Sequence, residues 1–227
     1  MEFYQMLSKY YDVIFPLNKK TVELVSEMTA KGGKILDVGC ATGQLIRALD
    51  NIGYDVTGLE YEPQLIGYSE KTISGDMHNL PFDNATYDTL VCTGNTLAHG
   101  SSVTDIANIL SEFSRVLKTG GKALIQILNY DRILEKRPPQ LSAIKTEDIT
   151  FERHYEYEGD SIKFTGKLIG EDVQQASSVQ LCPITYKEFI SAVEGAGFKI
   201  ESIYGGFDKS NFQIESSFPF IILLSNA

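Results

Sequence analysis

A glycine-rich turn contains the first residues whose types and spacing could bind a ligand. Residues 37–43 read Asp-Val-Gly-Cys-Ala-Thr-Gly and follow an apolar run, which predicts a strand that turns into a helix. Small residues at Gly39, Ala41 and Gly43 let a ligand approach the backbone, and the helix start offers free N–H groups. The G-x-A-x-G spacing is one residue shorter in its second step than the dinucleotide-binding pattern. We interpret the turn as a site for a ligand part that has no phosphate.

Two acidic residues stand at the ends of the next two predicted strands. Glu60 lies where an acid binds ribose hydroxyls, and its charge would repel a 2′-phosphate. Asp76 could accept a hydrogen bond from an adenine amino group while Met77 packs on the ring. Either acid alone could be a solvated carboxylate. Because the carboxyl ends of parallel strands meet at one edge of a sheet, the three strand ends together predict a nucleoside site.

The elements that must position these residues follow from hydrophobic periodicity. Apolar runs predict seven strands, at residues 35–38, 55–59, 73–75, 86–92, 122–128, 198–204 and 218–224. Apolar residues at three- and four-residue steps predict helices over 18–30 and 103–117. Another helix is predicted after Pro183, with Thr185 and Glu188 forming a capping box. This alternation predicts an α/β fold with a doubly wound, mostly parallel seven-stranded sheet.

The pattern changes in the second half of the chain. From Ile149 to Leu181 the apolar residues alternate with a period of two, which predicts antiparallel hairpins inserted after the fifth strand. We therefore expect four parts: an N-terminal helical segment over the ligand site at 1–31, a core at 32–144, an antiparallel insertion or lid at 145–183, and the last part of the core sheet at 184–227.

Composition excludes several classes of function. The 227 residues include 20 Lys and Arg against 30 Asp and Glu, for a net charge of −10. Nucleic acid is disfavoured as a partner because phosphate contacts need a clustered basic face, and the sequence offers only Lys19-Lys20 and Lys136-Arg137. The longest apolar run, 218–224, is too short for a membrane span. The first residues do not resemble a signal peptide, and the three cysteines lack metal-ligand spacing. We expect a cytoplasmic protein with free thiols and no bound metal.

Several segments resemble one enzyme family. LDVGCATGQL, TGLEY, SGDMHNLPF and YDTLV occur in the order found in class I S-adenosylmethionine-dependent methyltransferases. Residues 92–99 and 129–134 resemble the segments after the fourth and fifth strands of the glycine and sarcosine N-methyltransferases. The resemblance implies a Rossmann-like methyltransferase fold, S-adenosylmethionine as cofactor, and methylation of a small molecule, with an amine as the expected acceptor.

The turn, the strand ends and the resemblance together predict the site residues. Tyr10 and Tyr11, which precede the first predicted helix, match tyrosines that the family places against the cofactor. The predicted cofactor-binding residues are Tyr11, Asp37, Gly39, Ala41, Gly43, Glu60, Asp76, Met77 and Thr93.

Two further residues are candidates for catalysis. Asn95 could orient a nucleophile through its amide oxygen, or it could only brace its loop. His99 could accept a proton or a substrate hydrogen bond, or it could simply lie near a helix start.

One position departs from the family pattern. Leu128 stands where the family has an arginine that grips the acceptor carboxylate, and an alkyl group cannot replace a bidentate guanidinium. We therefore expect glycine to be a poor acceptor, unless a basic residue elsewhere supplies the clamp. The candidates for such a clamp are Arg132, Arg153 and Lys163.

Two alternative functions remain open at this point. An NAD-dependent oxidoreductase could use a similar sheet, but the short glycine step and Asp76 disfavour it. A methyltransferase-like protein could bind cofactor or a partner without catalysis, and the set of Gly39, Glu60 and Asp76 argues against that.

Overall fold

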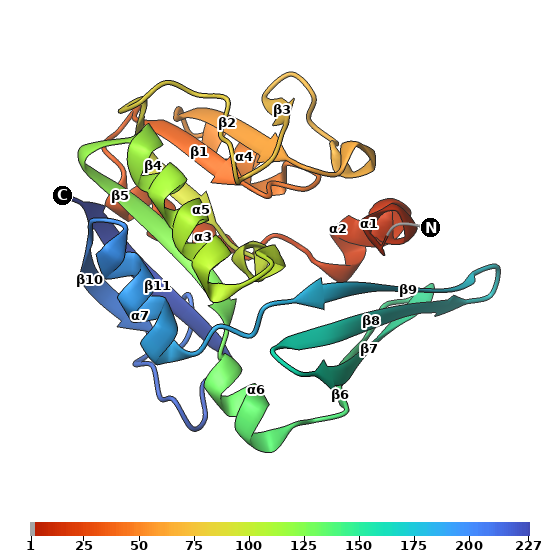
Figure 1. Cartoon of the computed structure of the whole chain (residues 1–227). Coiled ribbons are helices and arrows are strands. Elements are labelled where there is room, and N and C mark those ends of the chain that lie inside the picture. Colours follow the sequence, from red (N-terminus) through yellow and green to blue (C-terminus); the bar gives the residue numbers. More distant parts are fainter. Residues whose placement is uncertain (1–2) are drawn as a thin grey trace.

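The computed structural model describes residues 3–227 and contains a twisted seven-stranded sheet with helices on both faces (Figure 1). The strand order is β10-β11-β5-β4-β1-β2-β3. The strands are β1 Lys34–Val38, β2 Asp55–Glu60, β3 Thr72–Ser74, β4 Tyr87–Cys92, β5 Leu117–Leu128, β10 Phe198–Tyr204 and β11 Pro219–Asn226. Strands β1 to β5 pair in parallel, whereas β11 pairs antiparallel with β5 and with β10. The prediction of a mostly parallel, doubly wound sheet is confirmed.

Each face of the sheet has its own apolar cluster. Helices α3 (Lys19–Met28) and α4 (Gln44–Asp50) pack with Ile35, whereas α5 (Val103–Val116) and α7 (Tyr186–Gly195) pack with its neighbour Leu36. Successive strand residues point to opposite faces, so an uninterrupted apolar strand serves both clusters. The predicted capping box at the start of α7 is present. In the described part of the chain, no helix has the length and apolarity needed to cross a membrane.

A second, four-stranded antiparallel sheet follows α6 (Tyr130–Lys136), as Figure 1 shows. Its strands are β6 Gln140–Lys145, β7 Ile149–Glu158, β8 Ser161–Gly170 and β9 Gln174–Leu181. The predicted antiparallel insertion is therefore present, but the sequence pattern indicated neither β6 nor α6. Most of the side chains of β6 are exposed, so this strand has no apolar alternation to detect.

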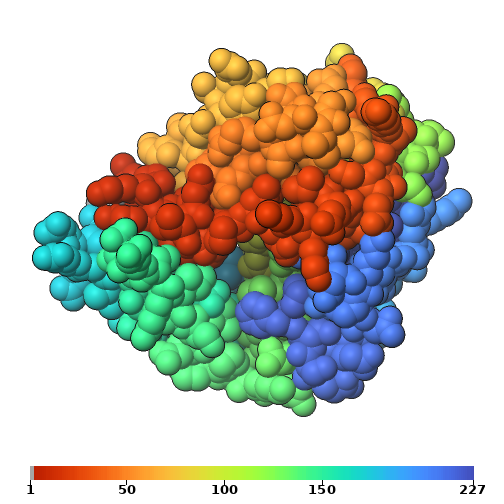
Figure 2. All heavy atoms as spheres, turned by 180° about the vertical axis from the view of Figure 1, so that it is seen from behind, coloured from red at the N-terminus to blue at the C-terminus, as the bar shows by residue number. Residues whose placement is uncertain are grey.

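The N-terminal segment is helical almost from its first described residue. It consists of α1 (Phe3–Leu7), a 3₁₀ turn η1 (Ser8–Tyr10) and α2 (Tyr11–Ile14). Tyr10 and Tyr11 therefore lie inside helical turns, and the expectation that they precede the first helix was wrong. Apolar side chains of the segment pack on the second sheet, and Figure 2 shows the two in contact from behind. The cluster contains Phe3, Met6, Leu7, Ile14, Ile149, Phe151 and Leu168.

The other side of the N-terminal segment is tied to the main sheet. The side chain of Gln44, at the start of α4, donates to Asp12 and to the carbonyl of Phe15, and it accepts from the N–H of Leu17. The segment therefore bridges the two sheets and lies over the carboxyl edge of the parallel strands (Figure 1).

Candidate functional site

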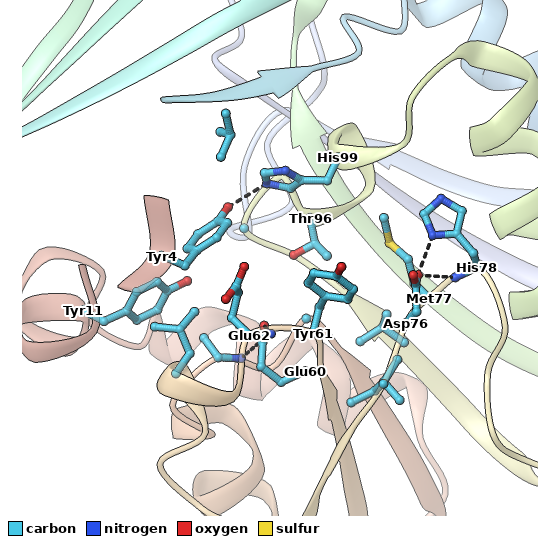
Figure 3. A pocket seen from close by; sticks show the side chains of 18 residues that line it. Tyr4, Tyr11, Glu60, Tyr61, Glu62, Asp76, Met77, His78, Thr96 and His99 are labelled. Atoms are coloured by element: carbon cyan, nitrogen blue, oxygen red, sulfur yellow. Dashed lines mark hydrogen bonds and ion pairs between the residues drawn. The ribbon is translucent and has the colours of Figure 1, made fainter. Parts of the chain in front are cut away.

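A cavity of about 360 Å³ opens at the carboxyl edge of the parallel strands, beside the N-terminal segment (Figure 3). Its volume lies in the range of small-molecule and cofactor sites. Of the predicted site residues, those that line it are Tyr11, Gly39, Ala41, Glu60, Asp76, Met77 and His99. Asp37, Gly43, Thr93 and Asn95 do not belong to its lining.

The turn after β1 is held in a conformation that favours small residues. Gly39, Ala41 and Gly43 all have positive φ angles, of 73°, 47° and 77°. A Cβ atom on Gly39 would approach the Thr96 side chain to 2.4 Å, so no larger residue fits without displacing it. The N–H groups of Gly39 and Cys40 both donate to the carbonyl of Leu59. The turn after β1 is thus fixed against the end of β2.

Glu60 connects the same two turns from the other side. Its side chain is 6 % exposed, and its carboxylate accepts hydrogen bonds from the N–H of Ala41 at 2.7 Å and of Glu62 at 2.9 Å. Burial raises the pKa of Glu60, although the backbone N–H groups oppose that shift. Asp37 lies behind it in β1, where burial, and then the Glu60 charge, raise its pKa to about 7.

Asp76 and His78 form a polar edge of the cavity. The backbone N–H and Nδ1 of His78 both meet Asp76 Oδ1, at 2.9 and 2.5 Å, while His78 Nε2 lies 3.0 Å from Asp105 Oδ2 on α5. Burial opposes ionisation of Asp76, but the bonds from His78 outweigh it and the pKa of Asp76 is lowered. Asp76 is therefore ionised and held at the cavity wall beside Met77.

His99 reaches the cavity from η3 (Thr96–His99), the turn that follows β4. Its Nε2 lies 2.6 Å from the hydroxyl oxygen of Tyr4, which comes from α1 (Figure 3). Burial lowers the pKa of His99 to about 4, so the imidazole is neutral at neutral pH.

Asn95 lies behind the cavity with its amide already engaged. Its Nδ2 donates to Tyr130 Oη at 2.8 Å, and its Oδ1 accepts from the N–H of Leu128 at 3.0 Å. These bonds connect the loop after β4 to the end of β5. The contacts favour the second of the two roles expected for Asn95, bracing of the loop.

The cavity contains residues that the sequence pattern did not single out. Tyr4 from α1, Tyr61 and Glu62 after β2, and Val179 from β9 all belong to its lining. In Figure 3 the Glu62 carboxylate points into the space between the rings of Tyr4 and Tyr61. The position of Glu62, two residues after Glu60, could have suggested it, whereas nothing in the sequence relates Tyr4 to residues near 60 or 99.

The charge of the lining is mainly negative, although His78, which is hydrogen-bonded to Asp76 and Asp105, offsets part of it. Three carboxylates belong to it, from Glu60, Glu62 and Asp76, and among the described residues around the cavity there is neither a lysine nor an arginine. Such a surface attracts cations, and tyrosine faces add to the attraction.

Comparisons with known proteins agree with this architecture. A family model described as a methyltransferase domain matches residues 35–121. The chain is 27% identical over 194 residues to a demethylmenaquinone methyltransferase of Thermotoga maritima, covering 80% of this chain and 76% of that protein. It is 29% identical over 126 residues to a glycine/sarcosine N-methyltransferase of Parasynechococcus marenigrum, covering 50% and 44%.

Solved structures extend the similarity to the whole fold. The CcbJ methyltransferase from Streptomyces caelestis matches with a TM-score of 0.83 at 16% identity, covering 98% of this chain and 97% of that one.

The alignments with curated relatives are less complete. They span 22% to 76% of those proteins' own lengths, and several span about half or less.

Proposed function

We propose that this chain is a class I S-adenosylmethionine-dependent methyltransferase and that it methylates the nitrogen of a small amine. The observation on which this proposal mainly depends is the charge of the cavity. Its lining combines a glycine turn and two strand-end acids with a third carboxylate, Glu62, and it has no lysine or arginine among the described residues. A positively charged cofactor and a basic acceptor both suit such a surface.

The residues at the sheet edge fit S-adenosylmethionine. Gly39 lines the cavity, and the carboxylates of Glu60 and Asp76 are acceptors for ribose hydroxyls and an adenine amino group. Tyr4 and Tyr11 offer ring faces to a sulfonium cation. When bound, S-adenosylmethionine supplies a methyl group on a positively charged sulfur.

The protein's part in the reaction is mainly positioning. Methyl transfer is an in-line displacement, so the acceptor nitrogen must be held in line with the methyl carbon and the sulfur. The Glu62 carboxylate and the tyrosine rings around it can collect a basic molecule at the open side of the cavity. The N-terminal segment and β9 cover this space and restrict the entry of water.

The same charge pattern argues against glycine as acceptor. Leu128 packs in the apolar cluster and its N–H is bonded to Asn95. Three basic residues could have replaced the missing arginine, but none belongs to the cavity lining. Arg153 donates to the carbonyl of Ser142, and Lys163 pairs with Glu156. A glycine carboxylate would therefore enter without a cationic partner, at a cost of several kcal/mol in a closed site.

Calorimetry tests the cofactor. We expect S-adenosylmethionine and S-adenosylhomocysteine to bind and NAD to give no heat. Tight binding of NAD without a response to S-adenosylhomocysteine would instead support the oxidoreductase alternative.

Methyl transfer from isotope-labelled S-adenosylmethionine tests the acceptor. Phenethylamine, tyramine and putrescine serve as amines without a carboxylate, glycine and sarcosine as amino acids, and catechol as an oxygen nucleophile. We expect kcat/KM for at least one of the three amines without a carboxylate to exceed that for glycine by tenfold or more. In Glu62→Gln, the ratio of these two kcat/KM values should be smaller. The proposal is wrong if glycine is the best of these acceptors, or if only catechol reacts.

A further inference from the structure

Tyr4 and His99 join two segments that are 95 residues apart in the chain. Tyr4 lies on α1 of the N-terminal segment, and His99 ends the turn after β4. Their polar atoms meet at 2.6 Å on the wall of the cavity (Figure 3). We propose that the Tyr4 hydroxyl holds the acceptor amine by one of its N–H groups, and that His99 is the positioning residue that orients this hydroxyl. This inference rests on the amine methylation proposed above.

The protonation states of the two residues set the direction of their bond. His99 is neutral at neutral pH, because burial lowers its pKa to about 4. Burial raises the pKa of Tyr4 well above its usual value, and the nearby Tyr11, Glu60, Tyr130 and Glu62 add to that shift. The hydroxyl therefore keeps its proton and can donate it to an unprotonated His99 Nε2. That leaves the lone pairs of the Tyr4 oxygen available as hydrogen-bond acceptors at the cavity wall.

A hydrogen-bond acceptor is what a neutral amine requires at this position. An aliphatic amine arrives as an ammonium ion and must first release one proton to solvent, after which the neutral nitrogen attacks the methyl carbon with its lone pair while the carbon–sulfur bond breaks. The enzyme can therefore hold this nitrogen only through its remaining N–H groups. The Tyr4 oxygen can accept one such N–H and thereby aim the lone pair.

A role of His99 as a general base fits the structure less well. An imidazole with a pKa near 4 is a weak base at neutral pH, and efficient general bases have a pKa near the working pH. We therefore assign His99 a hydrogen-bonding role in which no proton is transferred.

The packing of the N-terminal segment makes Tyr4 a fixed group. The ring of the preceding residue, Phe3, lies 5.4 Å from the ring of Phe164 in β8. Gly166 leaves the space for this contact, since a Cβ atom there would approach Phe3 and Phe151 to less than 3.0 Å. The insertion thereby holds α1 over the cavity, so the Tyr4 hydroxyl is preorganised.

Steady-state kinetics with the best amine of the panel tests the inference. We expect Tyr4→Phe and His99→Leu each to lower kcat by about tenfold, the effect of one hydrogen bond, and the double variant to lose little more. His99→Gln should keep most of the activity, because its amide oxygen can accept the Tyr4 proton but cannot act as a base. Tyr54→Phe is the matched control, since it removes one tyrosine hydrogen bond, to the carbonyl of Ser26, at a residue outside the cavity lining.

A second measurement needs neither cofactor nor acceptor. In ¹⁵N NMR spectra, His99 should have an unprotonated Nε2 and a protonated Nδ1 in the wild type. Its signals can be assigned by their loss in His99→Gln. Tyr4→Phe should change the tautomer populations, while Tyr54→Phe should not.

The outcomes separate this inference from the proposed function. If the wild type methylates an amine and Tyr4→Phe retains its kcat, the inference alone is overturned. The inference also fails if His99→Gln is as inactive as His99→Leu, because this indicates a base. If catechol is methylated and no amine is, both proposals fail. Unchanged affinity of the variants for S-adenosylhomocysteine, measured by calorimetry, supports a role confined to the acceptor.

Discussion

Replacement of Glu60 is expected to weaken the fold and the cofactor site together. The buried carboxylate accepts two backbone N–H groups, from Ala41 and Glu62, and these bonds connect the turns after β1 and β2. A hydrogen bond to a charged group contributes about 1.5–3 kcal/mol. The raised pKa of Glu60 shows that burying its charge is unfavourable. Glu60→Ala removes this unfavourable contribution, which offsets part of the stability lost with the two hydrogen bonds. We therefore expect the free energy of unfolding to fall by about 2–4 kcal/mol.

The same substitution removes an acceptor for the cofactor's ribose. We expect the dissociation constant of S-adenosylhomocysteine to rise by about 5- to 150-fold, which corresponds to about 1–3 kcal/mol. Urea denaturation measures the first effect, and calorimetry well below the unfolding midpoint measures the second. Glu60→Gln keeps one acceptor oxygen and should fall between the wild type and Glu60→Ala in stability.

Exposed Glu23 on α3 provides the control for this experiment. Glu23→Ala should change neither measurement beyond its error. If Glu60→Ala unfolds at the wild-type urea concentration, the two backbone bonds contribute nothing to stability. If its affinity for the ligand is also unchanged, Glu60 has no part in the site.

Two further predictions concern the fold. The raised pKa of Asp37, about 7 against an ordinary value near 4, means that its contribution to stability is greatest below about pH 4 and is lost as the pH rises to 7. Asp37→Asn should remove this pH dependence, which amounts to at most about 1.4 kcal/mol of unfolding free energy per pH unit. In urea unfolding at pH 5 and pH 8, the stability of the variant relative to the wild type should therefore be higher at pH 8. Thr185→Ala removes the capping box that Thr185 forms with Glu188, and should lower stability by about 0.5–2 kcal/mol in the same assay. An unchanged pH slope for the first variant, or an unchanged midpoint for the second, would contradict these expectations.

Much of the main sheet could be predicted because local signals agreed with the fold. The run from Val103 has apolar residues at helical steps, and Ser102 caps the resulting α5. The start of the strand that follows this helix was predicted less well. Strand β5 begins at Leu117, five residues before the predicted start at Lys122, because Leu117 pairs with Tyr87 of β4. A backbone pairing between segments thirty residues apart has no signature in a local window.

The part of the site on the sheet edge was also predictable. Gly39, Glu60 and Asp76 lie at the carboxyl ends of successive strands, and in a parallel sheet such residues meet by topology alone. The internal contacts of these residues were not predictable. The sequence does not reveal that Glu60 turns its carboxylate to the N–H of Ala41, because that bond depends on the positive φ of the turn.

The side of the cavity that we propose for the acceptor could not be derived from the sequence, for a physical reason that bears on specificity. Its residues come from three sources: Glu62 from a loop of the core, Tyr4 from the N-terminal segment, and Val179 from the inserted sheet. They meet because apolar side chains of α1 pack on the second sheet, and nonspecific apolar packing leaves no pattern that pairs distant segments. The half of the cavity that we propose for the cofactor is therefore built on strand ends of the core, whereas the half that we propose for the acceptor depends on how two peripheral elements meet above it. Substitutions in the N-terminal segment or the insertion can change the acceptor without disturbing the cofactor turn, so these two elements are where we expect acceptor specificity to be determined.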